Sequence, residues 1–157
     1  CQLILTLARA AGHAGMVGGQ AMDLAAENRA ISLAELEILH RHKTGALITA
    51  SVRMGAMAAG ASEQQLTALD TYSAAIGLAF QVQDDILDIE SSTEELGKTQ
   101  GADIAHHKST YPGLMGLCEA KKLAAQLEQD ALNALECFGE HADMLAGLAR
   151  YIVQRKY

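Results

Sequence analysis

Apolar residues recur every three or four positions along most of this chain, the spacing that gathers them on one face of a helix. The longest such stretch reads "LAELEILHRHKTGALITASVRMGAMAAG". It predicts one long helix from about residue 33 to about residue 58, ended by Gly60. Ser32 stands just before this stretch and Glu35 follows three residues later, so we expect a capping box at the start of the helix.

Two further stretches of helical spacing flank this one. After it, an apolar pattern opens at Ser62 and predicts a helix from Glu63 to about Ile89. Before it, an apolar helix opens the chain and leads into "GHAGMVGGQAMDLAAE", which is rich in glycine and other small residues. This composition predicts close helix packing, with a turn around Gly18 and Gly19.

The last third of the chain begins with a stretch that has no apolar period. "ESSTEELGKTQGADIAHHKST", residues 90–110, therefore predicts a long loop, and loops of this length are usually functional or disordered. Pro112 marks the first turn of a helix that runs to about Glu136, and a final helix covers about 141–155. We therefore expect an all-α bundle of about six helices.

Composition agrees with helices and limits the partners. Half of the 157 residues are apolar, only 4% are aromatic and one is proline, a balance typical of packed helices rather than of a sheet. The net charge of −7 speaks against nucleic-acid binding, which needs a net basic face. An anionic ligand would have to be met by individual lysines.

The cysteines and the apolar runs suggest where the protein works. Cys1, Cys118 and Cys137 lie far apart without metal-binding spacing, so we expect reduced thiols in a cytoplasmic protein. No apolar run approaches the roughly 20 residues of a membrane span, and we expect a soluble protein. Because the chain opens on Cys1 in mid-pattern, we also expect that it begins inside a larger protein.

Three acids interrupt the apolar stretch "AFQVQDDILD", residues 79–88. On a helix, Gln81, then Asp84 or Asp85, and then Asp88 fall on one stripe, where like charges repel. Mg²⁺ removes this conflict, since it takes one or two carboxylates, several waters and phosphate oxygens. The alternative is a solvated acidic face near the end of a helix.

Lys43 interrupts the apolar stripe of the long helix, so its ammonium group either reaches water or meets an anion. Gly45 loosens the helix here, which would leave a backbone carbonyl or the Thr44 hydroxyl available to a ligand. His40 and His42 point to different sides of a helix, and we expect surface or capping roles for both.

Lysines also stand near both ends of the predicted loop. Lys98 and Lys108 would place cations beside the acids of the preceding helix, so a metal and a phosphate-rich ligand would fit between them. His106 and His107 are expected to be exposed loop residues. Asp103 is expected to orient Lys98 or a loop amide rather than to bind metal.

Five stretches together resemble the trans-prenyltransferases, the farnesyl/geranyl diphosphate synthase family, and most closely its bacterial members. They are, in family order, "GMVGGQAMDL", "HRHKTGALITASVRMGA", "AIGLAFQVQDDILDI", "LGKTQGADI" and "HKSTYP", and "DDILD" matches the second aspartate-rich motif of the family. The resemblance implies a helical bundle of the isoprenoid synthase type, with residues 1–157 as the carboxy-terminal part of one domain. It also implies Mg²⁺-dependent condensation of an allylic diphosphate with isopentenyl diphosphate, farnesyl diphosphate as the expected product, and a homodimer.

The resemblance assigns roles around the leaving diphosphate. It implies that Lys43, Lys98 and Lys108 bind the diphosphate of the allylic substrate. It implies that Asp84 binds metal directly, whereas Asp85 and Asp88 act through metal-bound waters or support the site. Mg²⁺ and lysines would neutralise the charge that develops on the diphosphate.

Neutral groups are assigned to the allylic cation, because water or a strong nucleophile would destroy it. The resemblance gives this role to Thr44, to Gln81 and to the Lys43 carbonyl. In the complete protein, Asp84→Ala is expected to raise the Mg²⁺ requirement. Gln81→Ala is expected to slow ionisation with the Mg²⁺ dependence unchanged.

One feature of the family is missing from these residues. The first aspartate-rich motif and the groups that bind isopentenyl diphosphate are absent, so we expect this chain alone to bind diphosphate poorly and to be inactive. The alternatives are a non-catalytic scaffold or regulatory subunit, and a generic bundle that binds divalent cations. Charge reversal at Lys98 would separate them, since it removes diphosphate binding only in an enzyme.

Overall fold

The computed structural model describes residues 1–94 and 109–156, with side chains described up to 90 and again from 109. Every regular element in these ranges is helical, which confirms the all-α prediction. The elements are α1 (Gln2–Ala11), α2 (Met16–Ala26), α3 (Leu33–His40), the π-helical turn η1 (Arg41–Gly45), α4 (Ala46–Ala58), α5 (Glu63–Glu94), α6 (Tyr111–Met115), α7 (Leu117–Ala134), the 3₁₀ helix η2 (Glu136–Ala142) and α8 (Asp143–Gln154).

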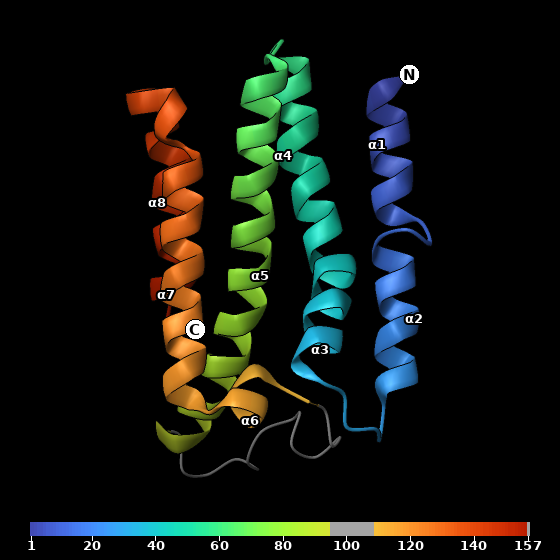
Figure 1. Ribbon diagram of the computed structural model, residues 1–157, viewed down its shortest axis with the longest axis vertical. Coiled ribbons are helices and arrows are strands. Elements are labelled where there is room, and N and C mark those ends of the chain that lie inside the picture. Colours follow the sequence, from blue (N-terminus) through green and yellow to red (C-terminus); the bar gives the residue numbers. More distant parts are fainter. Residues whose placement is uncertain (95–108, 157) are drawn as a thin grey trace.

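The long helical segments run side by side, as Figure 1 shows. α1 and α2 are stacked end to end along one edge, the continuous rod α3–η1–α4 lies next to them, and α5 occupies the centre with α7 and α8 beyond it. α5 packs against α4, η1, α7 and α8. The short α6 lies at the end of the bundle where α2 and α5 finish and α3 begins. These long segments agree with the predicted helices of the sequence.

The core is built around α5. Its buried side chains face the small residues of α7, where buried alanines recur at helical spacing and allow the two helices to approach closely. The core residues of these two helices are Leu66, Leu69, Tyr72, Ala75, Ile76, Leu78, Ala79, Val82 and Ile86 on α5, and Ala120, Ala124, Leu127 and Ala131 on α7. The core therefore continues along α5 to the acidic stretch.

Glycines bring α2, η1 and α5 unusually close together. A Cβ atom added at Gly19 would stand 2.2 Å from the backbone nitrogen of Lys43, and one added at Gly77 would stand 3.2 Å from the Cα of Gly45. The predicted turn around Gly18 and Gly19 is therefore wrong, since both residues lie inside α2 and the chain turns between α1 and α2 instead. The prediction of close helix packing holds.

The first long helix and the helix after it differ from prediction only in detail. The predicted segment 33–58 is one rod, but Arg41–Gly45 within it forms a π-helical turn, at the place where Gly45 was expected to loosen the helix. Gly60 follows it with a φ of +78°, as expected of the residue that ends a helix. α5 continues to Glu94, so the first part of the predicted loop is helical. Residues 95–108 of that loop lie outside the described ranges.

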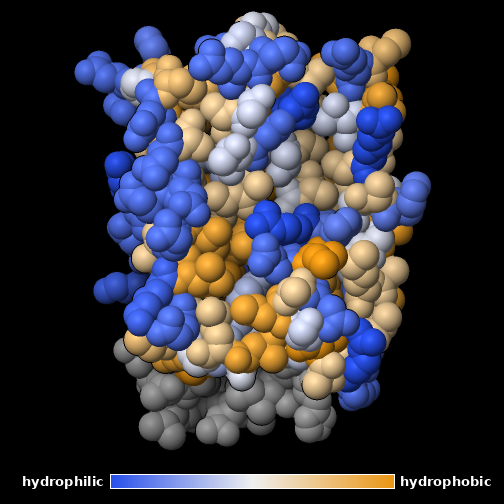
Figure 2. Space-filling view, in the orientation of Figure 1, coloured by the Kyte–Doolittle hydropathy of each residue, from blue (hydrophilic) through white to orange (hydrophobic). Residues whose placement is uncertain are grey.

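Two boundaries near the end of the chain also differ. The segment that begins at Pro112 is not one helix, because Gly116 adopts a φ of +86° and separates α6 from α7. A 3₁₀ helix joins α7 to α8, and the final helix is Asp143–Gln154. The space-filling view shows apolar surface in the lower half of the molecule and a polar edge over α7 (Figure 2).

Apolar side chains are also exposed on the two helices that form one edge of the bundle. On α1 and α2, Ile4 is 76% exposed, Val17 53% and Leu24 58%. Single exposed apolar residues are common, but a series along neighbouring helices is typical of a surface that packs against another element. None of the helices in the described ranges is both long enough and apolar enough to cross a membrane.

Candidate active site

A pocket opens where α2 ends and α6 begins. Part of its lining is apolar. The polar lining comes from the end of α2, the α3–η1 junction, α5 and the residues before α6, namely Asp23, His40, Lys43, Gln81, Asp84, Asp85, Ser109 and Thr110. Segments far apart in the sequence thus meet at one end of the bundle. Four of the residues predicted for the site, Lys43, Gln81, Asp84 and Asp85, line this one pocket.

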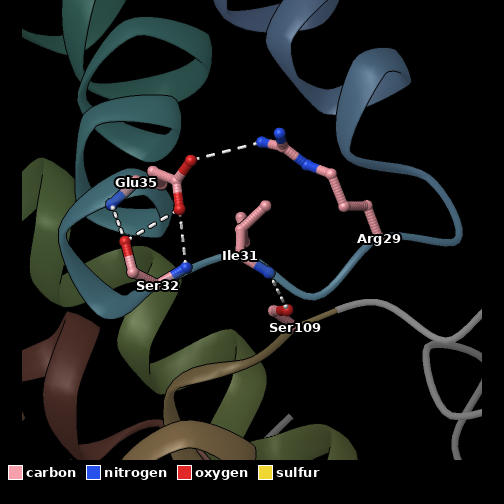
Figure 3. Close-up of polar contacts among 5 residues, drawn as sticks. All are labelled: Arg29, Ile31, Ser32, Glu35 and Ser109. Carbon is pink, nitrogen blue, oxygen red and sulfur yellow. Dashed lines mark hydrogen bonds and ion pairs between the residues drawn. The ribbon is translucent and has the colours of Figure 1, made fainter.

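Local hydrogen bonds fix the link between α2 and α3, which contributes Ile31 to the lining of the pocket. The Ser32 hydroxyl accepts a hydrogen bond from the Glu35 N–H at 3.3 Å, and the Ser32 N–H donates to Glu35 Oε2 at 2.8 Å, which confirms the capping box. Arg29 reaches Glu35 from the end of α2, and the Ile31 N–H donates to the Ser109 hydroxyl at 3.2 Å (Figure 3). The link between α2 and α3 is therefore attached to the segment that leads into α6.

This arrangement also changes the pKa of Glu35. Hydrogen bonds from the backbone and side chain of Ser32 lower the pKa of the Glu35 carboxyl below its ordinary value of 4.5, and the nearby Arg29 acts in the same direction. The charged form is thus the one that holds the start of α3.

The Lys43 ammonium group meets an anion, which is one of the two alternatives that the sequence left open. Its Nζ lies 2.7 Å from Asp23 Oδ2, with the Lys43 side chain 32% exposed and that of Asp23 15% exposed. The π-helical turn carries Lys43, and Gly19 lets α2 approach closely enough for Asp23 to reach it. Sequence reasoning missed Asp23. The available signal was its position near the C-terminal end of a helix, where the helix dipole disfavours an acid.

Asp84 lies between two nitrogen donors. Gln81 Nε2 is 3.5 Å from Asp84 Oδ2, one turn earlier on α5, while Arg155 forms an ion pair with Asp84 Oδ1. The Asp84 side chain remains 43% exposed. Sequence reasoning did not predict Arg155, because the order of residues gives no sign that the end of α8 meets α5 here.

Asp85 serves the neighbouring helix. Its Oδ2 accepts a hydrogen bond from the Tyr111 N–H at 2.9 Å, which places its carboxylate at the N-terminus of α6. The Thr110 hydroxyl accepts from the Gly113 N–H at 3.2 Å and caps the same helix. Burial raises the pKa of the Tyr111 hydroxyl, and the carboxylates of Glu37 and Asp85 add to this shift. Asp84 and Asp85 therefore have separate partners.

The two histidines near Lys43 behave differently. His42 Nδ1 lies 2.8 Å from the Ile38 carbonyl oxygen, a local contact of the kind expected. His40 is half-buried, lines the pocket, and has its ring centre 5.6 Å from that of Tyr111. The expectation of a surface or capping role does not hold for His40, because its side chain lines the pocket beside Tyr111 of α6 and, among the described residues, makes no cap hydrogen bond at η1.

The remaining predicted residues are less informative. Asp88 and Thr44 are half-buried and lie on α5 and in η1, but neither belongs to the described lining of the pocket. Lys98, Asp103, His106, His107 and Lys108 lie outside the described ranges. Cys1, Cys118 and Cys137 are exposed free thiols.

The described donors suit Mg²⁺ in one specific way. Within residues 1–94 and 109–156 no three histidine, cysteine or acidic side chains form a cluster that would hold a metal by themselves. Mg²⁺ does not need such a cluster, since it is usually held by one or two carboxylates with waters and phosphate oxygens. Asp84 fits this role, because it is exposed, lines the pocket and keeps Oδ2 on the side of Gln81. Asp85 is already bonded to the backbone of Tyr111.

Comparisons with known proteins agree with this fold. The chain matches the polyprenyl synthetase family model over residues 2–144. The farnesyl diphosphate synthase of Escherichia coli strain K12 is 53% identical over 157 residues, which cover 98% of this chain and 52% of that enzyme. An FPP/GFPP synthase from Zymomonas mobilis superimposes with a TM-score of 0.83 and 38% identity, over 96% of this chain and 50% of that one.

A further solved structure was determined with ligands. It is a geranyltransferase from Helicobacter pylori in complex with magnesium and isoprenyl diphosphate, and it matches with a TM-score of 0.77 and 36% identity over 97% of this chain and 50% of that one. The helical architecture is thus that of the isoprenyl diphosphate synthases, as the sequence implied. The chain belongs to the polyprenyl synthetase family. It spans about half the length of the curated relatives that it matches.

Proposed function

We propose that the protein to which this chain belongs is a Mg²⁺-dependent prenyltransferase that condenses an allylic diphosphate with isopentenyl diphosphate, with farnesyl diphosphate as the main product. The observation that carries this proposal is the meeting of Lys43 from η1 with Gln81 and Asp84 from α5 in one pocket. A cation, an amide and a carboxylate at these positions suit a substrate that releases diphosphate and becomes a carbocation.

The proposed role of Lys43 follows from the charge that develops as the allylic carbon–oxygen bond breaks. The bonding electrons move to the diphosphate, and a fixed ammonium group stabilises that charge more than it stabilises the intact ester. Lys43 is held near the pocket by Asp23 until an anion competes for it. Mg²⁺, when bound at Asp84, would supply further stabilisation of the leaving group.

The allylic cation requires neighbours that are neutral but electron-rich. The amide NH₂ of Gln81 faces Asp84, so its carbonyl oxygen is the end that we assign to the cation. We propose that Thr44 and the Lys43 carbonyl, both in the π-helical turn, add to this lining. The carbon–carbon bond then forms from the double bond of isopentenyl diphosphate, and a proton is lost to the released diphosphate.

We propose that residues 1–157 are the carboxy-terminal part of one prenyltransferase domain. Two observations support this: the chain spans about half of its relatives, and the exposed apolar faces of α1 and α2 suit burial under further helices. On this proposal the chain alone is inactive, and Lys98, Lys108, Asp85 and Asp88 complete the diphosphate and metal site. A homodimer in the cytoplasm is the assembly that we expect for the complete protein.

The test is a product assay on the complete protein. Dimethylallyl or geranyl diphosphate is incubated with isopentenyl diphosphate and MgCl₂, and the chain length of the product is measured. We expect farnesyl diphosphate, a higher Mg²⁺ requirement for Asp84→Ala, and slower turnover at an unchanged Mg²⁺ requirement for Gln81→Ala. Asp143→Ala, at an exposed acid of α8, serves as the control. Absence of any condensation, or the same Mg²⁺ curves for both site variants, would contradict the proposal.

A further inference from the structure

Arg155, just beyond the end of α8, makes more contacts than a surface arginine needs. Its guanidinium forms an ion pair with Asp84 Oδ1 and also donates to the Phe80 carbonyl from Nη2 and to the Ile152 carbonyl from Nε, each at 3.3 Å. The guanidinium carbon lies 4.4 Å from the centre of the Phe80 ring. These contacts fix the planar group in one orientation.

The backbone of Arg155 is attached to the same helix. Gln83 Nε2 donates to the Arg155 carbonyl at 3.3 Å, and Gln83 is a buried polar residue on α5. Contacts from two consecutive turns of α5 therefore hold both the main chain and the side chain of Arg155. The guanidinium would stay in place even if the Asp84 side chain rotated away.

Arg155 and Asp84 stand on different sides of the pocket wall. The Arg155 side chain is only 14% exposed, whereas Asp84 is 43% exposed and belongs to the described lining of the pocket. Arg155 itself lines a separate surface depression formed by the end of α8. It therefore contacts Asp84 from behind and does not face the space that a ligand would occupy.

We propose that Arg155 is a positioning residue for Asp84: it binds Oδ1 and so leaves Oδ2 as the oxygen presented to a magnesium diphosphate in the pocket. The inference rests on the proposed function, because it concerns the same site. Hydrogen-bond partners of metal-binding side chains typically change metal affinity about 10–100-fold when they are removed. Asp84 would thus act as a ligand of fixed direction rather than as one of several mobile acids.

The charge of Arg155 does not counteract its geometric effect when the ligand is a magnesium diphosphate. A guanidinium behind a carboxylate weakens the attraction of that carboxylate for a bare Mg²⁺ ion. The complex of Mg²⁺ with diphosphate is an anion or is close to neutral, so a nearby cation does not oppose its binding. Binding of inorganic diphosphate in the presence of MgCl₂ is therefore the suitable measurement, and binding of Mg²⁺ alone is not.

The experiment is a double-mutant cycle in the complete protein. The affinity for inorganic diphosphate at saturating MgCl₂ is measured by calorimetry for the wild type, Arg155→Gln, Asp84→Asn and the double variant. We expect Arg155→Gln to weaken binding about tenfold in the wild type, yet less than about twofold when Asp84 is already replaced. Arg155→Lys keeps the charge but not the planar fork, so it should restore only part of the affinity.

Controls separate positioning from stability and from general charge. Arg150→Gln removes the same charge from an exposed position on α8 and should leave the affinity unchanged. Unfolding temperatures of all variants show whether a loss of affinity follows a loss of folding. Equal losses from Arg155→Gln in both backgrounds, or no loss in either, would overturn the inference while wild-type binding stands. If the wild type itself did not bind magnesium diphosphate, the proposed function would fail, and the inference with it.

Discussion

α5 carries two ion pairs of the same chemical type at two levels of the bundle. In its first half Asp70 pairs with Arg53 of α4, and the two side chains are 35% and 34% exposed. In its second half Asp84 pairs with Arg155, and here the carboxylate is 43% exposed while the arginine is 14% exposed. The two side chains of the first pair are almost equally exposed to solvent. In the second pair the arginine is mostly buried, whereas the acid is exposed.

The second oxygen of each carboxylate explains the difference. Asp70 Oδ1 is buried and has no hydrogen-bond donor among the described residues. Asp84 Oδ2 lies 3.5 Å from Gln81 Nε2, and Asp84 lines the pocket. An arginine–aspartate pair does not by itself identify a functional site. What distinguishes Asp84 is that Arg155 holds one oxygen, while the other makes, within the described residues, only a long contact of 3.5 Å with Gln81 Nε2, in a side chain that lines the pocket.

The largest expected effect comes from removing each acid in turn. In the complete protein, Asp84→Asn should lower prenyl diphosphate synthesis on the order of 100-fold, because the leaving group loses its metal-linked stabilisation. Asp70→Asn should leave activity nearly unchanged and lower the free energy of unfolding by about 1 kcal/mol. Steady-state rates and denaturant unfolding of both variants check this. A comparable loss of activity in Asp70→Asn would remove the distinction between the two pairs.

A substitution that separates the helices around the pocket should act on stability instead. A Cβ at Gly19 would stand 2.5 Å from the Cα of Lys43, so Gly19→Ala must move α2 away from η1. We expect a loss of about 1–3 kcal/mol in the free energy of unfolding.

Gly55 is the matched control because it lies inside α4 with nothing within 4 Å of an added Cβ. Gly55→Ala should stabilise the protein by about 0.5–1 kcal/mol, since alanine is the better helix former. Chemical denaturation measures both changes. A stable Gly19→Ala variant would show that the close approach of α2 and η1 is not required.

Lys43 and Asp23 form a third ion pair, which lies in the pocket. Lys43→Gln should weaken binding of inorganic diphosphate about tenfold, the value of one charge-assisted hydrogen bond. Arg41→Gln removes the same charge from the same π-helical turn, where Arg41 pairs with Glu37 on the exposed face, and should leave affinity unaltered. Calorimetric titration in MgCl₂ compares the two. Equal losses would point to net charge rather than to the pocket.

The smallest effect is expected at the start of α3, where Arg29 and Glu35 form a pair that is 62% and 52% exposed. Because the folded-state pKa of Glu35 is lowered from 4.5, its contribution to stability is present above that value and is lost as the pH falls through the lowered pKa. The unfolding temperature of Glu35→Gln should therefore lie slightly below wild type at neutral pH, and the difference should vanish in acid. A difference that does not change with pH would contradict this origin.

Much of the fold could be predicted because apolar residues recur every three or four positions in a helix that packs against a core. The capping box at Ser32 and the helix end at Gly60 depend on local chemistry, and the structure has both. The turn expected at Gly18 and Gly19 was wrong because a glycine needed for a turn and one needed for a helix contact look alike in sequence. Only the contact of Gly19 with the backbone of Lys43 tells them apart.

Part of the candidate site could also be predicted from the sequence. Lys43, Gln81 and Asp84 stood out because polar residues interrupted an apolar stripe, and they do line one pocket. Asp23 and Arg155 did not, because their roles depend on which helices become neighbours in space. The resemblance suggested the chemistry, whereas the tertiary structure revealed the partners of Lys43 and Asp84.

The most direct test of the account is a titration of the complete protein with inorganic diphosphate at several MgCl₂ concentrations, for the wild type, Asp84→Asn and Asp70→Asn. If Asp84 holds a magnesium diphosphate in this pocket, binding depends on Mg²⁺, is reduced about tenfold in Asp84→Asn and is retained in Asp70→Asn. Binding that is independent of Mg²⁺, or equally strong in Asp84→Asn and the wild type, would contradict the assignment of this pocket to a magnesium diphosphate.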